Sequence, residues 1–147
     1  VEDLSIGSKP MPAERFIDTN ILLYGYDCDA GSKRDIALPL IEEGWKQPGR
    51  NVVSVQVLQE FYVNFLRLVQ AHEEAVRVIE DLTSWPVIDN SLERFGHGLI
   101  LKERFQVSLW DAMILAAAQA SGARELLTED LNPGQDYDGV RAVNPFA

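Results

Sequence analysis

The sequence of 147 residues predicts an α/β fold in which a doubly wound sheet of about five parallel strands is flanked by helices. Short apolar stretches alternate with amphipathic segments of about ten residues or more, a pattern typical of parallel strands joined by helices. Right-handed crossovers between such strands would place all their carboxyl ends on one edge of the sheet. The length suits one domain with a hydrophobic core and is too short for two.

Five short apolar stretches are the predicted strands. Phe16 and Ile17 belong to the first, and the others are expected at residues 51–53, 86–88, 125–128 and 140–143. Continuous apolar runs of this kind are typical of strands that are buried on both faces. Residues 129–139 are predicted to be a polar loop between the last two strands.

Helices are predicted between these strands. The first is expected to begin near Ile21, directly after a polar break at residues 18–20. Ser54 is a suitable N-cap for a long helix with apolar residues at spacings of three and four. Ser108 would cap a strongly apolar helix at 109–120, which Gly122 would end. Further helices are expected near residues 33–45, 72–83 and 91–105.

The first ten residues are polar and precede Met11. We expect them to be an added leader or a disordered tail, with Met11 as the natural start and residues 11–147 as a single domain. This segment carries two acidic residues and one lysine, so the remaining residues keep a charge of −9 out of the total of −10. The acidity therefore belongs to the domain itself.

Composition excludes several classes of function. A net charge of −10 argues against a broad electrostatic surface for nucleic acid, so a polyanionic substrate would require local basic residues or metal ions. No apolar run approaches the ~20 residues of a membrane span. Cys28 is the single cysteine and cannot form an internal disulfide, which fits the cytoplasm. Dinucleotide and phosphate-loop motifs and a nucleophile elbow are absent from the sequence.

Four acidic residues fall where the carboxyl edge of the sheet is expected. Asp18 follows the first strand, Glu60 lies about two turns into the helix after the second strand, and Asp111 is in the first turn of the Ser108 helix. Asp130 follows the fourth strand. Carboxylates that are close together repel one another unless they are protonated or bound to cations, and such oxygen-rich sites suit Mg²⁺ or Mn²⁺.

Each of these residues also has an ordinary structural explanation. Asp18 is a possible helix N-cap, Asp111 matches a capping box with Ser108, and Asp130 is a suitable turn former. Glu60 lies near the edge of the apolar stripe and is compatible with a solvated helix surface. The four explanations would have to hold independently at one edge of the sheet, which favours a shared site. Three tryptophans are interpreted as core or interface residues rather than as a base-stacking platform: Trp45, Trp85 and Trp110.

The chain resembles the PIN-domain ribonucleases, and within them the VapC toxins of VapBC toxin–antitoxin pairs. The resemblance rests on FIDTN at residues 16–20, QEF at 59–61, WDA at 110–112, LTED at 127–130 and VNPF at 143–146. It implies a five-stranded parallel sheet in the order 3-2-1-4-5, a Mg²⁺- or Mn²⁺-dependent endoribonuclease, a VapB-like antitoxin as partner, and a homodimer.

The resemblance also implies roles for individual residues. The metal-binding aspartates correspond to Asp18, Asp111 and Asp130, and the catalytic set also includes Glu60. Supporting roles fall to Thr19, Asn20 and Thr128, which would orient carboxylates, and to Glu129, which would share in the cation site. Four basic residues are candidates for a rim that binds RNA: Arg15, Arg67, Lys102 and Arg104.

Hydrolysis of an RNA phosphodiester by metal-activated water is the function that we predict from these residues. Glu60 would position that water or accept its proton. One alternative is a free-standing PIN nuclease of RNA processing. A second is a Mg²⁺-binding phospho-receiver domain, although the last predicted strand offers Arg141 and no lysine. A third is a catalytically silent PIN-like module that only binds a partner.

Overall fold

The computed structural model describes residues 13–147, and these form an α/β domain as predicted. Our expectation for residues 1–10 and for Met11 lies outside the described residues. No helix in the described part is long and apolar enough to cross a membrane. The elements are β1 (Arg15–Ile17), α2 (Thr19–Tyr26), α3 (Ser32–Lys46), β2 (Asn51–Ser54), α4 (Val55–Val69), α5 (His72–Leu82), β3 (Val87–Ile88), α6 (Leu92–Phe105), α7 (Leu109–Ser121), β4 (Glu125–Leu127), β5 (Asp136–Tyr137) and β6 (Val140–Val143).

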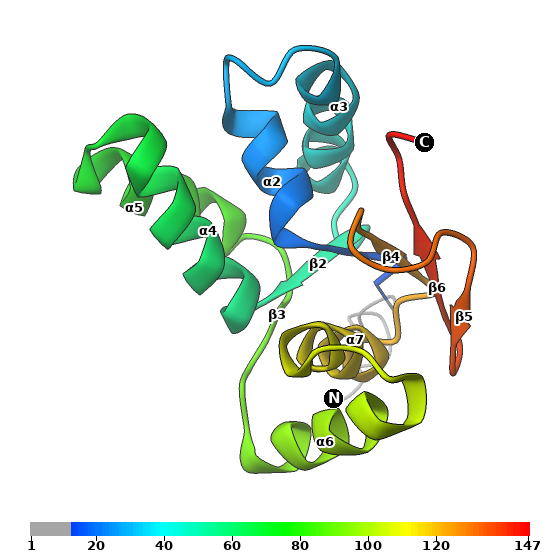
Figure 1. Ribbon diagram of the computed structural model, residues 1–147. Helices are drawn as coiled ribbons and strands as arrows, with labels where there is room; N and C mark the ends of the chain where they lie inside the picture. The colour runs from blue at the N-terminus through cyan, green and yellow to red at the C-terminus, as the bar shows by residue number, and fades with distance from the viewer. Residues whose placement is uncertain (1–12) are drawn as a thin grey trace, which may run out of the picture.

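The sheet has the order β3-β2-β1-β4-β6-β5, and every pairing is parallel except that of β5 with β6. Phe16 in β1 is aligned with Val52 on one side and with Leu126 on the other. Figure 1 shows α2 and α3 on one face of the sheet and α6 and α7 on the other, with α4 and α5 extending beside its β3 edge. The five predicted parallel strands and their order are thereby confirmed.

β5 was not predicted, because it lies inside the stretch that we expected to be a loop. Tyr137 pairs with Val140 across a tight turn in which Asp138 has φ 56° and Gly139 has φ 103°. Two consecutive residues with positive φ are the signature of a hairpin turn whose preferred sequences include Asp-Gly. The Asp138-Gly139 pair was therefore a usable sequence signal for this hairpin.

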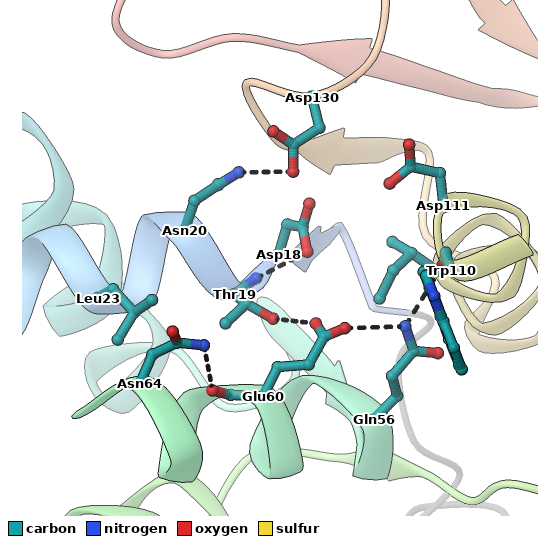
Figure 2. A pocket seen from close by; sticks show the side chains of 11 residues that line it. Asp18, Thr19, Asn20, Leu23, Gln56, Glu60, Asn64, Trp110, Asp111 and Asp130 are labelled. Carbon is teal, nitrogen blue, oxygen red and sulfur yellow. Dashed lines mark hydrogen bonds between the residues drawn. The ribbon is translucent and has the colours of Figure 1, made fainter. Parts of the chain in front are cut away.

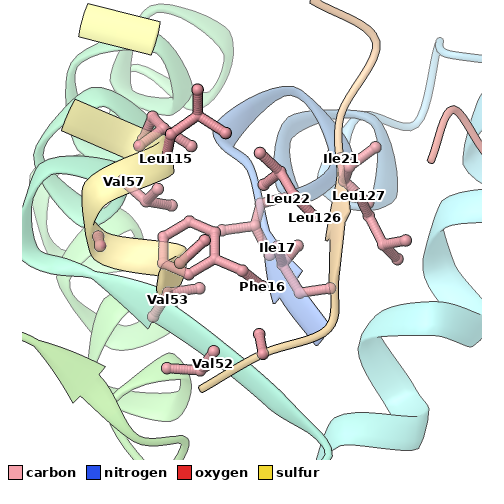
Figure 3. Close-up of a cluster of buried hydrophobic side chains, with 14 of the residues drawn as sticks. Phe16, Ile17, Ile21, Leu22, Val52, Val53, Val57, Leu115, Leu126 and Leu127 are labelled. Carbon is pink, nitrogen blue, oxygen red and sulfur yellow. The ribbon is translucent and has the colours of Figure 1, made fainter. Parts of the chain in front are cut away.

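The core is centred on β1, whose side chains are enclosed on both faces of the sheet. Phe16 and Ile17 are fully buried and pack among apolar side chains from β2, β4, α2 and α7 (Figure 3). Burial of a side chain of this size stabilises the fold by about 1.5–3 kcal/mol. The backbone N–H of Asp18 continues the ladder by donating to Leu127 O at 3.1 Å. The position of Asp18 is therefore fixed by a buried strand in the interior of the sheet.

The amino end of β1 carries a buried cation. Arg15 is 6% exposed, and its Nε donates to Asn51 Oδ1 at 2.7 Å while one terminal nitrogen donates to Leu40 O at 2.9 Å. The same guanidinium forms an ion pair with Glu43 at 3.1 Å. Arg15 therefore lies at the opposite end of the strand from Asp18, and our expectation that it contributes to an RNA-binding rim was wrong.

Candidate metal site at the carboxyl edge of the sheet

A pocket of about 290 Å³ lies where β1 and β2 run into α2 and α4, next to the first turn of α7. The side chains of Asp130, Asp111 and Asp18 face one another across it, and Glu60 lies on the α4 side (Figure 2). The structure therefore brings together all four carboxylates that the sequence predicted at this edge. The lining consists of Asp18, Thr19, Asn20, Leu23, Gln56, Glu60, Asn64, Trp110, Asp111, Ile114 and Asp130.

Asp18 is both a helix cap and a member of the pocket. Its Oδ1 accepts from Thr19 N at 2.7 Å, which makes it the N-cap of α2, and its Oδ2 accepts from Thr128 Oγ1 at 2.7 Å. The side chain is 6% exposed. Burial raises the pKa of this carboxyl to about 7, with smaller contributions from Asp130 and Glu60, while its two hydrogen bonds oppose the shift.

Glu60 is held by hydrogen bonds to both of its carboxylate oxygens. Oε1 accepts from Thr19 Oγ1 at 2.7 Å, and Oε2 accepts from Gln56 Nε2 at 3.3 Å. Because Thr19 is the first residue of α2 rather than its cap, its hydroxyl is free to reach across to α4. Thr19 thus connects the end of β1 to the pocket glutamate.

Asp130 and Asp111 complete the carboxylate set. Asp130 Oδ2 accepts from Asn20 Nδ2 at 3.0 Å, and its backbone N–H donates to Thr128 Oγ1 at 3.0 Å. Ser108 caps α7 by accepting from Asp111 N at 3.0 Å, as predicted. The pKa of Asp111 is raised by burial and then by the charge of Asp130, and that of Asp130 by burial and then by Glu129.

Glu129 does not line the pocket, although it precedes Asp130 in the chain. It accepts a hydrogen bond from the Tyr24 hydroxyl and forms an ion pair with Lys33 at 3.0 Å. The Lys33 ammonium also lies 4.6 Å from the centre of the Tyr24 ring, which packs edge-on against Phe146. Glu129 thus fastens the loop after β4 to α2 and α3, and the structure does not place it where it would share a cation.

The pocket residues suit a divalent cation in their chemistry. No three His, Cys, Asp or Glu side chains within residues 13–147 are gathered closely enough to hold an ion as they stand. All of the pocket's charged groups are nevertheless carboxylates, the donors that Mg²⁺ and Mn²⁺ prefer. Asn20 Oδ1 is a buried acceptor without a hydrogen-bond partner in the described structure. A cation would relieve the mutual repulsion of the carboxylates.

Three polar or aromatic lining residues were missed by the sequence analysis. Gln56 and Asn64 lie four residues before and after Glu60, so they share its face of α4, and helical spacing was a usable signal for them. Trp110 was interpreted as a core or interface residue. Its 66% exposure at the pocket shows that it is not a core residue, and the interface interpretation stays a prediction. None of the four residues proposed for a basic rim lines the pocket, and Arg104 is instead paired with Asp138 at 2.8 Å.

Comparison with known proteins places the chain in a family. A sequence model of the PIN domain matches residues 15–135, and no curated protein sequence matches. Solved structures that share the fold include the following three. A toxin–antitoxin complex from Klebsiella pneumoniae has 26% identity and a TM-score of 0.66 over 90% of this chain and 98% of that one. The sarcin–ricin loop cleaving toxin VapC20 from Mycobacterium tuberculosis has 17% identity and a TM-score of 0.61 over 80% of this chain and 92% of that one.

The third structure is a DNA-bound VapBC complex from Salmonella typhimurium, with 19% identity and a TM-score of 0.62 over 88% of this chain and 96% of that one. The chain belongs to the PIN-domain family, because the family match spans most of its length. Structures of VapC-type toxin–antitoxin proteins share its fold, so the predicted resemblance is confirmed. This membership excludes the phospho-receiver alternative.

Proposed function

We propose that the protein is a Mg²⁺- or Mn²⁺-dependent endoribonuclease and the toxin of a type II toxin–antitoxin pair. The observation that carries the proposal is the set of four carboxylates from four separate segments that line one pocket of a PIN fold. The named activity of VapC20, which cleaves the sarcin–ricin loop, supports RNA as the substrate class. Residues 11–147 would form the single functional domain, in the cytoplasm.

In this proposal Asp18, Asp111 and Asp130 hold the cation. When bound, Mg²⁺ or Mn²⁺ supplies Lewis-acid stabilisation of a phosphate and lowers the pKa of water toward neutrality. The hydrogen bonds from Thr128 to Asp18 and from Asn20 to Asp130 fix the orientation of two of these carboxylates. These contacts support the roles that the resemblance implies for Thr128 and Asn20.

Glu60 is the proposed acceptor of the proton from the attacking water. Thr19 and Gln56 hold its carboxylate at the pocket wall, so it is oriented before substrate arrives. Water would form a new bond to phosphorus while the bond from phosphorus to the 3′ oxygen breaks. The leaving oxygen takes a proton from solvent, and the products carry a 5′-phosphate and a 3′-hydroxyl.

The proposed partners are a VapB-like antitoxin and a second copy of the chain. Toxin–antitoxin complexes among the structures that share the fold support the first. An exposed apolar stripe on α6 supports the second, because Leu92, Phe95 and Leu99 recur at spacings of three and four and are 85%, 42% and 47% exposed. Stripes of this kind on soluble proteins mark interaction surfaces.

The proposal is tested by cleavage of total RNA by the purified protein with Mg²⁺, with Mn²⁺ and with a chelator. We expect cleavage only with a cation, and its loss in Asp18→Asn, which keeps the size of the side chain but removes its charge. Asp138→Asn is the matched control, since Asp138 is paired with Arg104 outside the pocket. Cleavage by Asp18→Asn at the wild-type rate would overturn the assignment. No cation-stimulated cleavage of tRNA, rRNA or mRNA would instead favour a silent PIN-like module.

A further inference from the structure

Trp110 presents its indole to solvent at the edge of the carboxylate pocket. The side chain is 66% exposed, whereas the following residues of α7 are largely buried, among them Ala112 and Leu115. Figure 2 shows the ring beside Gln56, on the same side of the pocket as Asp111. Because the exposed ring lies at the edge of a polar pocket, its apolar face is available to contact a ligand or a partner.

The backbone of Trp110 is tied to the pocket. Gln56 Nε2 donates to Trp110 O at 3.3 Å, and the same nitrogen donates to Glu60 Oε2 at 3.3 Å. Asp111, the next residue, is fixed by the Ser108 cap. The backbone of Trp110 therefore has a set place relative to two of the four carboxylates, and the exposed indole is free to receive a flat group.

Within residues 13–147, the pocket offers RNA no cationic side chain. Its charged lining residues are all acidic, and neither lysine nor arginine is among the lining residues. In the proposed site the bound cation supplies the positive charge that attracts the phosphate, and contacts that do not depend on charge would add to the affinity for RNA. Stacking of a nucleobase on an aromatic ring is such a contact, and it serves any base because every base has a π-face.

We propose that Trp110 stacks on a nucleobase of single-stranded RNA adjacent to the scissile phosphate. The inference rests on the proposed nuclease function, because it names how that site holds its substrate. Trp110 would act in binding, so that its loss raises KM more than it lowers kcat. The competing role for an exposed tryptophan is a protein interface, in which case the ring would contact another chain and not RNA.

The test combines changes in the protein with changes in the RNA. The cut site is first mapped with wild-type protein, and a short synthetic RNA spanning it is then made with a single abasic nucleotide at each position near the cut. Cleavage is measured for wild type, Trp110→Ala and Trp110→Phe. Trp45→Phe is the matched control, since Trp45 is 37% exposed but does not line the carboxylate pocket. Size-exclusion chromatography of every variant follows the oligomeric state.

We expect Trp110→Ala to lower kcat/KM by about tenfold, mainly through KM, and Trp110→Phe to restore most of the loss. At one position the abasic nucleotide should lower kcat/KM of wild type by about the same tenfold. It should leave kcat/KM of Trp110→Ala almost unchanged, because that variant already lacks the contact. Equal losses for both proteins at every position would overturn the stacking role while leaving the nuclease intact. Activity lost together with oligomeric state would assign Trp110 to an interface. A wild-type protein that cleaves no RNA would overturn both proposals.

Discussion

The two ends of β1 each bury a charged side chain, and the surroundings of the two charges differ. Arg15 at the amino end and Asp18 at the carboxyl end are both 6% exposed. Arg15 meets the opposite charge of Glu43 and has two further acceptors. Asp18 receives two hydrogen bonds but faces carboxylates, and no cationic side chain of the described part of the chain lines its pocket.

This difference separates a structural charge from a binding charge. Compensation of Arg15 within the chain ties β1 to β2 and α3, and it leaves nothing for a ligand to supply. The charge of Asp18 is left for an external cation to compensate, at a cost in stability of the metal-free protein. Natural sites commonly depart from optimal stability in this way, because a group that is already satisfied cannot bind.

The largest effect on stability is expected at the amino end. Arg15→Met removes the cation, leaves Asn51 Oδ1 without its donor and should lower the free energy of unfolding by about 3 kcal/mol. Unfolding of both proteins in denaturant measures this loss of stability. Arg104→Met is the control, since the Arg104 and Asp138 side chains of that pair are 59% and 38% exposed and its loss should cost less than about 1 kcal/mol. Equal losses in the two variants would contradict the structural role of Arg15.

At the carboxyl end of β1, removal of the charge of Asp18 should raise the stability of the metal-free protein, whereas removal of Arg15 lowers it. The folded pKa of Asp18, about 7, lies above its ordinary value, so its contribution to stability is complete below about pH 4 and is lost as the pH rises through 7. Asp111 and Asp130 are shifted in the same direction. Metal-free Asp18→Asn should therefore be more stable than wild type at pH 8, by on the order of 2 kcal/mol, and no more stable at pH 4.

Thermal unfolding of both proteins between pH 4 and pH 8, in chelator and in Mn²⁺, checks this prediction. Mn²⁺ should stabilise wild type at pH 8, because a ligand that binds only the folded state adds stability, and it should have a much smaller effect on Asp18→Asn. A stability difference between Asp18→Asn and wild type that does not grow from pH 4 to pH 8 without metal would contradict the assignment of Asp18 as an uncompensated charge.

The sequence analysis located these two ends with different success. Asp18 and Asp130 were found because each follows a strand, and parallel topology gathers the carboxyl ends of strands at one edge. Asp111 and Glu60 were found because they lie in the first two turns of helices expected to begin at that edge. Arg15 was assigned to the wrong edge. Each residue of a strand advances the chain by about 3.3 Å, so a residue three positions before Asp18 belongs to the other end of so short a strand.

Side-chain partners from distant segments were beyond sequence reasoning. The contact of Glu129 with Lys33 joins residues 96 positions apart, and nothing in the local sequence indicates it. Gln56 and Asn64 were within reach, because helical spacing alone places them beside Glu60. The exposure of Trp110 depends on how α7 is set against α4, and the position of the residue next to Asp111 did not reveal it.

The smallest effect is expected for Glu129, which lies next to Asp130 but outside the pocket. Its pair with Lys33 is partly exposed, at 22% and 42% for the two side chains, so Glu129→Gln should change the free energy of unfolding by less than about 1 kcal/mol. Cleavage should persist, with at most about a tenfold loss from a looser Asp130 loop, and its dependence on Mn²⁺ concentration should be unchanged. If Glu129→Gln shifted the Mn²⁺ concentration for half-maximal cleavage as much as Asp130→Asn does, Glu129 would be a cation ligand. Its side chain would then have to leave its contacts with Tyr24 and Lys33 and turn into the pocket.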